Sequence, residues 1–263
     1  MKNIFIEGIQ GMGKSTLLQE IAKQRPDYRV CREGDYSPVE LAWCTWMTDK
    51  EYAGILERYA PIRKEIEAHT VKEGNHYIVS YTGILTDIPH FHKDLERYEI
   101  YNGRKSLEEL EQIISDRYHR FCGTGYLFEC SFLQNIMEEL LLFHQLSDEE
   151  ILSFYRRLLP HVKKEHFLLL YLYSDRIEEN IRTIQKERSD QDGNPLWYPL
   201  MLEYLIHSPY GMQHGYKSFE DMISHFQNRQ QLELRIIHEL LPDCSLILPA
   251  KEWKLEDIAG ILQ

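Results

Sequence analysis

Residues 8–16 combine glycines, a lysine and two hydroxyl side chains at a spacing that suits phosphate chemistry. Gly8 and Gly13 stand five positions apart, and Lys14 and Ser15 follow directly. Glycines let a loop curl so that its N–H groups point at a phosphate, a lysine adds a cation, and a serine hydroxyl can ligate Mg²⁺. The stretch predicts the donor half of a nucleotide site, in which Lys14 meets the β and γ phosphates and Ser15 meets Mg²⁺; the alternative is a glycine turn that binds nothing.

The elements around this loop are those that a phosphate site needs. An apolar run at residues 4–6 predicts a buried strand, and helical composition at 17–22 predicts a helix whose N-terminus faces the phosphate. Pro26 ends that helix. The expected nucleotide contacts are Gly8, Gln10, Gly11, Met12, Gly13, Lys14, Ser15 and Thr16, with Lys186 and Arg188 from a later helix.

Two carboxylates follow predicted strands. Glu33 comes after a strand expected at residues 28–32, and Glu129 ends a strand expected at 125–129. Ligands of doubly wound sheets bind at the carboxyl ends of the strands, so Glu33 is a candidate to meet the phosphoryl acceptor. Glu129 is the candidate to orient the hydrated Mg²⁺. The alternatives are a solvated turn residue for Glu33 and a helix-capping residue for Glu129.

A cationic helix is expected at residues 175–188. It carries Arg182 and Lys186 on one face and Arg188 at its end, and a polar loop follows. A cationic helix that leads into such a loop suits a lid over a polyphosphate, which we place at about residues 182–215. The plain alternative is a solvated basic face.

The remaining segments of the chain predict an insertion and further helices and strands. Residues 32–43 predict a polar turn that leads into an aromatic-rich helix, and 207–215 predict a loop. Residues 48–123 are expected to form a mainly helical insertion on the acceptor side. Further helices are expected at 51–71, 93–101, 106–121, 132–144, 196–206, 218–241 and 255–262, one more begins at 147–150, and strands are expected at 77–82, 166–173 and 245–248.

Composition limits the classes of partner. The chain has 263 residues, a formal charge of −12 and five scattered cysteines. An acidic chain does not favour nucleic acid, and no apolar stretch approaches the roughly 18 residues of a membrane span. The first strand begins at once, which leaves no room for a signal peptide, and the cysteines suit free thiols. We expect a single cytoplasmic domain with no nucleic-acid or membrane partner, and we leave a homodimer open.

With these features together, the chain resembles the P-loop kinases of nucleosides and nucleotides, the group that holds thymidylate kinases and deoxynucleoside kinases. The first of four matching stretches, Ile-Glu-Gly-x-x-Gly-x-Gly-Lys-Ser-Thr, includes the glutamate before the first glycine. The resemblance implies a three-layer α/β fold with a parallel core of about five strands, and Mg·ATP as the donor. It implies that Glu33 acts as the base or the orienter of an acceptor hydroxyl and that Arg182 with its neighbours clamps the transferring phosphate. The four stretches are residues 6–16, 32–38, 128–131 and 173–188.

Two departures from the family pattern bear on the acceptor. Gln10 stands where thymidylate kinases carry aspartate, and Cys130 replaces an arginine that could make a bidentate contact with phosphate. A neutral hydroxyl acceptor, nucleoside-like, is therefore favoured, although Arg32 could compensate. A nucleoside monophosphate kinase, an antibiotic kinase and a nucleotide-gated switch remain alternatives. The catalytic candidates are Lys14, Glu33 and Arg182, and the acceptor-binding candidates are Arg32, Tyr36, Trp43 and Tyr81.

Overall fold

A computed structural model describes residues 1–190, 194 and 196–260 of the chain. The chain divides into two compact units. The core unit comprises Met1–Val30 and Gly123–Gln263, and the inserted unit comprises Cys31–Cys122. The insertion expected at residues 48–123 covers most of the inserted unit.

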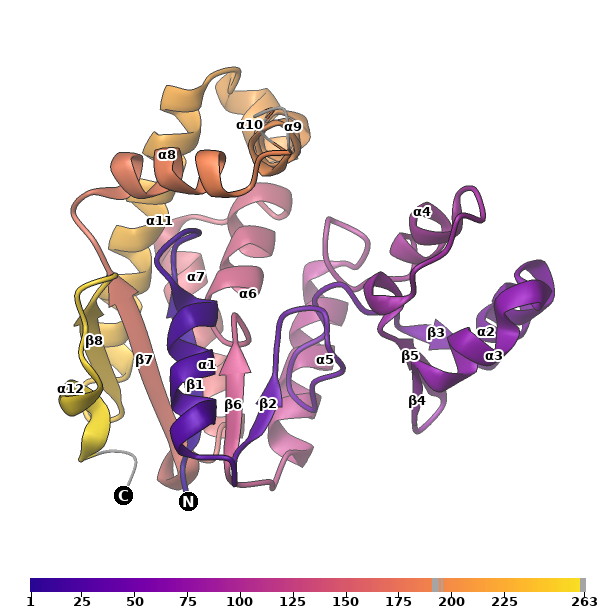
Figure 1. The fold of residues 1–263 in the computed structure, drawn as a ribbon, viewed down its shortest axis with the longest axis horizontal. Coiled ribbons are helices and arrows are strands. Elements are labelled where there is room, and N and C mark those ends of the chain that lie inside the picture. Colours follow the sequence, from indigo (N-terminus) through magenta and orange to yellow (C-terminus); the bar gives the residue numbers. More distant parts are fainter. Residues whose placement is uncertain (191–193, 195, 261–263) are drawn as a thin grey trace. The chain divides into compact units, whose positions relative to one another are not determined.

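The core unit is an α/β structure around a five-stranded, all-parallel sheet of order β2-β6-β1-β7-β8 (Figure 1). Every residue of β1 is buried, as in parallel sheets whose two faces are both covered. The register sets Ile6 opposite Glu129 and Gly8 opposite Leu172. The strands are β1 (Asn3–Gly8), β2 (Arg29–Cys31), β6 (Tyr126–Glu129), β7 (Phe167–Tyr173) and β8 (Ser245–Pro249).

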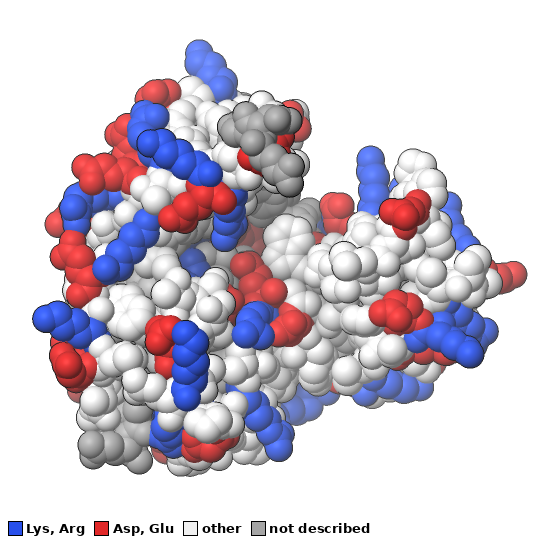
Figure 2. All heavy atoms as spheres, viewed as in Figure 1, with Lys and Arg blue, Asp and Glu red and all other residues white. Residues whose placement is uncertain are grey.

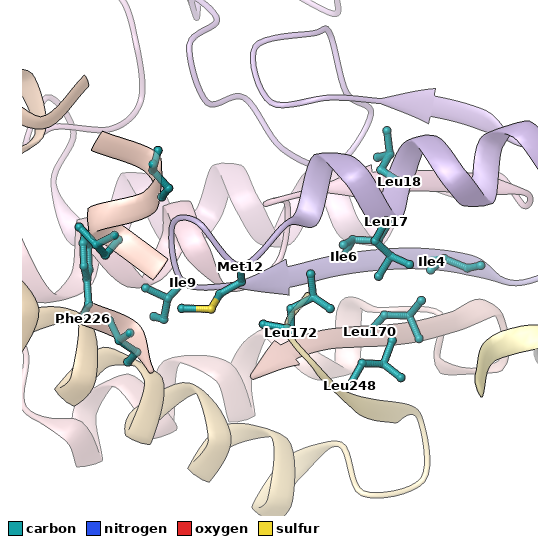
Figure 3. Close-up of a cluster of buried hydrophobic side chains, with 14 of the residues drawn as sticks. Ile4, Ile6, Ile9, Met12, Leu17, Leu18, Leu170, Leu172, Phe226 and Leu248 are labelled. Atoms are coloured by element: carbon teal, nitrogen blue, oxygen red, sulfur yellow. The ribbon is translucent and has the colours of Figure 1, made fainter. Parts of the chain in front are cut away.

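Successive side chains of β1 point to opposite faces of the sheet. Ile4 and Ile6 share a buried cluster with Leu17 of the first helix (Figure 3). Phe5 faces the other way and packs on Phe132, with the ring centroids 6.2 Å apart. Phe132 in turn packs on Tyr155 of the helix Asp148–Leu158, with the ring centroids 5.4 Å apart. Helices therefore cover both faces of the sheet.

The helices of the core unit begin and end close to the predicted positions, with two exceptions. Residues 207–215 were expected to be a loop, and this was wrong: Ser208 caps a helix by accepting a hydrogen bond from the Gly211 N–H at 2.9 Å. The helix expected at 132–144 begins at Gln134 and opens into a π-helix. The helices are α1 (Lys14–Gln24), α6 (Gln134–Glu138), the π-helix (Glu139–Phe143), α7 (Asp148–Leu158), α8 (Ile177–Glu187), α9 (Trp197–His207), α10 (Pro209–His214), α11 (Phe219–Leu240) and α12 (Leu255–Ala259).

The inserted unit adds a small antiparallel sheet to its helices. The strand expected at 77–82 is present as the central strand of three, which begins at His76, and the other two strands were not predicted. Gly74, with φ 55°, allows the tight turn between β4 and β5. The elements are β3 (Met47–Thr48), α2 (Asp49–Arg58), α3 (Arg63–Ala68), β4 (Thr70–Glu73), β5 (His76–Val79), α4 (Phe91–Glu96) and α5 (Leu107–Arg120).

The aromatic-rich helix expected within residues 32–43 is absent, although the structure describes this whole segment. Side chains take up backbone N–H groups there, in place of the backbone hydrogen bonds of a helix. Ser37 Oγ accepts from the Val39 N–H at 3.3 Å, and Glu40 accepts from the Ala42 N–H at 2.7 Å. Trp43 has φ 60°, a left-handed conformation that ends any helix.

Basic and acidic side chains are interspersed over the face of the molecule in Figure 2. The five cysteines are all free thiols, as expected. Among the described residues, no helix is long and apolar enough to cross a membrane.

Candidate functional site

The loop between β1 and α1, residues 8–13, is called the glycine loop here. Gly8, Gly11 and Gly13 have φ values of 139°, 80° and 90°, which residues other than glycine rarely adopt. A Cβ on Gly8 would lie 2.6 Å from the Leu172 carbonyl oxygen, and one on Gly11 would collide with the Ile184 side chain of α8. The glycines therefore shape the loop and let β7 and α8 pack closely against it.

Helix α1 begins at this loop without a side-chain cap. Gly13 is the capping residue. The first turn of α1, all of which the structure describes, holds no acidic residue. Uncapped N–H groups at a helix N-terminus attract anions, and the helix dipole adds to this attraction. Ser15 and Thr16 are exposed there. The arrangement can hold a phosphate.

Lys14 crosses the glycine loop. Its Nζ donates to the carbonyl oxygens of Gly8 at 2.8 Å and Ile9 at 3.0 Å, and the residue is 8% exposed. The lysine therefore holds its positive charge inside the curl of the loop, where a phosphate oxygen would compete for the same ammonium group.

Ser15 and Glu129 meet, as the prediction of a shared metal site requires. The Ser15 hydroxyl donates to Glu129 Oε1 at 2.5 Å. Glu129 ends β6 beside Ile6 and is 7% exposed, so the sheet register fixes the carboxylate. One hydroxyl and one carboxylate form an oxygen donor set of the kind that Mg²⁺ takes together with substrate phosphates. No group of three or more acidic, histidine or cysteine residues that could hold a metal occurs within the described ranges.

Glu7, noted in the sequence only as part of the resemblance, ties the loop's strand to α6. Its two carboxylate oxygens accept from the Phe132 N–H at 2.7 Å and the Gln134 N–H at 3.0 Å. Burial raises the pKa of Glu7 to about 7, and these hydrogen bonds oppose the rise. Glu7 therefore fixes the turn that follows Glu129.

Gln10 links the glycine loop to a buried charge cluster that the sequence did not reveal. Its Oε1 accepts from Arg229 of α11 at 2.8 Å, and its Nε2 donates to Glu138 of α6 at 3.4 Å. Arg229 also pairs directly with Glu138, and its side chain is 0% exposed. Gln10, which stands where thymidylate kinases carry aspartate, thus anchors the glycine loop to α6 and α11.

The rest of this cluster lies along α11 and on β7. His225 bonds to Glu138 at 2.8 Å, Arg229 lies 3.0 Å from Glu233, and the Tyr171 hydroxyl donates to Glu233 at 2.6 Å. Burial alone would raise the pKa of Glu138, but Arg229 and His225 lower it to about 2. We call these residues, with Gln10, the Arg229 cluster. The sequence held one signal: positions 225, 229 and 233 recur every four residues on one helix face.

The cations predicted for the lid lie on and beyond α8. Arg182 is exposed, pairs with Glu178, and holds its guanidinium 4.4 Å from the Phe219 ring centroid. Lys186 and Arg188 are also exposed, and Arg188 lies 5.8 Å from the Trp197 ring centroid. The described contacts of these three residues do not include the glycine loop. The α8 residues that touch it are Asn180 and Ile184.

The predicted acceptor-side residues all belong to the inserted unit. Arg32 and Glu33 are exposed in the turn after β2, and Trp43 is 46% exposed. The Tyr36 hydroxyl donates to a carboxylate, Glu73 Oε1, at 2.6 Å. Tyr81 is 3% exposed and belongs to the hydrophobic core of its unit, which gives it a packing role. The roles of the other four in acceptor binding stay predictions.

Cys130 follows Glu129 in a left-handed conformation, with φ 57° and an N–H that donates to the Ile6 carbonyl at 3.2 Å. Its side chain is 1% exposed. It supplies neither a charge nor an accessible group at the position where the resembling family carries arginine.

Comparison with known proteins gives no assignment: the chain matches no family model, and no curated protein matches it significantly. The chemistry of the site therefore rests on the glycine loop, the start of α1 and the contact between Ser15 and Glu129.

Proposed function

We propose that the chain is an ATP-dependent phosphotransferase that moves the γ-phosphoryl group to a hydroxyl of a small, nucleoside-like acceptor. The carrying observation is the hydrogen bond from Ser15 to Glu129 beside the uncapped start of α1. A turn that bound nothing would not need a hydroxyl at the start of α1 held against a buried carboxylate at the end of β6. The order of the parallel sheet is compatible with the three-layer fold of P-loop kinases.

The donor half follows from the residues of the glycine loop. Loop and first-turn N–H groups would hold the phosphates of ATP, and Lys14 would exchange its carbonyl contacts for phosphate oxygens. Gln10 keeps the loop curled through the Arg229 cluster. Such chemistry depends on positioning and electrostatics, so these contacts do most of what the protein must do.

Ser15 and Glu129 would hold Mg²⁺, whose charge would neutralise the oxygens of the β and γ phosphates. Ser15 would contribute its hydroxyl oxygen directly. Glu129 would accept hydrogen bonds from the waters on the metal, and its fixed place at the end of β6 makes it a rigid partner.

The transfer step needs a proton acceptor and a mobile cation. The acceptor oxygen would bond to the γ-phosphorus while the bond to the β–γ bridging oxygen breaks and ADP leaves, and Glu33 would take the hydroxyl proton. Arg182 or its neighbours Lys186 and Arg188 would stabilise the charge on the bridging oxygen.

The test is ATP turnover with Mg²⁺ against a library of nucleosides, nucleotides and hydroxylated antibiotics. Ser15→Ala and Glu33→Gln should each lower acceptor-dependent ADP release by roughly 10²-fold or more. Glu57→Gln, an exposed acid of α2, is the matched control and should be unchanged. ATP binding without any active acceptor, and turnover indifferent to Glu33, would overturn the proposal in favour of a nucleotide-gated switch.

A further inference from the structure

A second concave site lies within the core unit, against the Arg229 cluster. It is a cavity of about 350 Å³, at the lower end of the range of roughly 300–1,000 Å³ for small-molecule sites. Helix α11 forms one wall with His225, Asn228 and Arg229, and the α10 segment adds Tyr210 and Tyr216. Its volume and its mixture of apolar and polar walls suit a small ligand.

The charges around the cavity, which include the carboxylate of Asp148, argue against an anionic ligand. Arg229 is already compensated by Glu138 and Glu233. Arg235, the other arginine of the lining, pairs with Glu149 at 2.6 Å and with Glu239 at 2.7 Å. Neither guanidinium has charge to spare, so a phosphate or carboxylate would gain little there.

The uncharged lining groups favour a flat heterocycle with hydrogen-bonding edges. Tyr210 and Tyr216 meet edge to face with centroids 5.7 Å apart, and Tyr216 lies 6.2 Å from the His225 ring. Aromatic walls of this kind bind planar rings. Asn228 and Gln231 add two amides, each of which can donate and accept along the edge of a nucleobase-like ring.

The cavity is connected to the glycine loop by a short chain of polar contacts. His225 in the cavity wall bonds to Glu138 at 2.8 Å, and Glu138 in turn accepts from Gln10 of the loop at 3.4 Å. Arg229 reaches from the same wall to Gln10 at 2.8 Å. A ligand that shifts either wall residue would change the hydrogen bonds that hold the loop, because buried polar networks respond as units.

We propose that this cavity is an effector site for a neutral, planar nitrogen heterocycle of nucleobase type, and that its occupancy changes the affinity of the glycine loop for nucleotide. Only the second half rests on the proposed function. The ligand stacks against the tyrosines, bonds to Asn228 and Gln231, and acts on the loop through His225, Glu138 and Gln10.

The test uses the full chain and titrates cytosine and adenine while the ¹H–¹⁵N signals of the Asn228 and Gln231 side-chain amides are followed. Both signals should shift saturably, and Asn228→Trp, which fills the cavity next to Gln231, should abolish the shift of the remaining Gln231 signal. Gln227→Trp is the matched control, since Gln227 is also exposed on α11 but does not line the cavity. In the same samples, ADP affinity measured by calorimetry should change by about fivefold or more on saturation with base, the lower end of typical allosteric coupling.

Each other outcome overturns part of the inference. If the bases shift only the Gly11 and Gly13 amides, they bind the nucleotide site and the cavity is not a site. Tighter binding of benzoate than of cytosine at Asn228 would overturn the ligand class. If cytosine binds at Asn228 while ADP affinity stays constant, the site stands and the coupling fails; if ADP does not bind at all, it is the proposed function that fails.

Discussion

Glu138 of the core unit and Glu40 and Glu99 of the inserted unit are all buried carboxylates, but they are compensated differently. In the core unit, Glu138 faces Arg229 and His225, which lower its pKa to about 2 against the effect of burial. In the inserted unit, Glu40 and Glu99 accept hydrogen bonds from neutral groups, among them the Ala42 N–H and the Tyr81 hydroxyl. Burial raises the pKa of each to about 7. The same side chain thus depends on a cation at Glu138 and on a proton at Glu40 and Glu99, as it also does at Glu7 of the core unit.

The contrast shows where each unit is vulnerable. The core unit should fail when a partner charge is removed, because an unpaired buried carboxylate is costly. The inserted unit should respond to pH across the neutral range, because its carboxyls change charge there. Four pairs of substitutions test this difference, from the largest expected effect to the smallest.

Arg229→Met removes the cation of the core unit. It leaves Glu138 and Glu233 buried without their guanidinium, and the free energy of unfolding should fall by about 3–5 kcal/mol at pH 7. Arg235→Met on the same helix breaks only partly exposed pairs and should cost about 0–1 kcal/mol. Urea unfolding of both variants measures the difference. Equal losses of unfolding free energy would show that the buried ion pairs of Arg229 stabilise the fold no more than the partly exposed pairs of Arg235 do.

Glu99→Gln tests the inserted unit. Because the folded-state pKa is raised, the folded chain holds a proton that the unfolded chain releases, and stability falls as pH rises from about 4.5 to about 7. The wild type should lose at most on the order of 3 kcal/mol from this group, and the variant should lose less. Urea unfolding at pH 5, 6, 7 and 8 gives the slopes.

The control for that experiment is Glu138→Gln, whose group has a lowered pKa. Its contribution is present above about pH 4.5 and is lost as pH falls toward 2, so it should leave the slope between pH 5 and 8 unchanged. A slope that is the same in wild type and Glu99→Gln would contradict the assignment of a neutral carboxyl to the inserted unit.

Gln10→Leu cuts the link between the glycine loop and the Arg229 cluster while it keeps a similar volume. The loss of a hydrogen bond to a charged group should cost about 1.5–3 kcal/mol. ADP affinity, measured by calorimetry, should fall as well. Gln19→Leu, an exposed residue of α1, is the control and should change neither quantity; a nucleotide affinity unaffected by Gln10→Leu would mean that the cluster does not shape the loop.

Ser106→Ala and Ser218→Ala remove equivalent helix caps, one in each unit. Both serines form capping boxes, with Glu109 on α5 and with Asp221 on α11. Each change should cost about 1 kcal/mol by urea unfolding. Equal effects would mean that the units differ in their buried charges and not in their local helix stability.

The sequence was most informative where burial is uniform. The strand at residues 4–6, the turn after it and the strand ending at Glu129 were predictable, because a strand of a parallel sheet is a continuous apolar run and the glycines sit at fixed positions. Ser15 and Glu129 were predicted to serve one Mg²⁺ site, and the two side chains are in contact in the structure.

The features that could not be predicted from the sequence are buried polar side chains, very short strands and a tertiary contact. A helix face that carries His225, Arg229 and Glu233 reads as solvated, and only the tertiary structure supplies the partners that let it be buried. The short strands of the inserted unit are two to four residues long, too brief for a period to emerge. The contact of Arg182 with Phe219 could not be read from charge spacing, because it is a tertiary contact between α8 and α11.

The chain leaves the core unit and returns to it at two neighbouring points. The Arg29 N–H donates to the Gly125 carbonyl at 2.8 Å, so the two points that flank the inserted unit are neighbours. A short Gly-Ser linker could join them without stretching the sheet. A chain trimmed in this way is expected to keep the core unit's fold and ADP binding, measurable by circular dichroism and calorimetry, while it loses acceptor turnover. The inserted unit would then be an exchangeable cassette, through which one phosphate-handling core could be matched to different substrates.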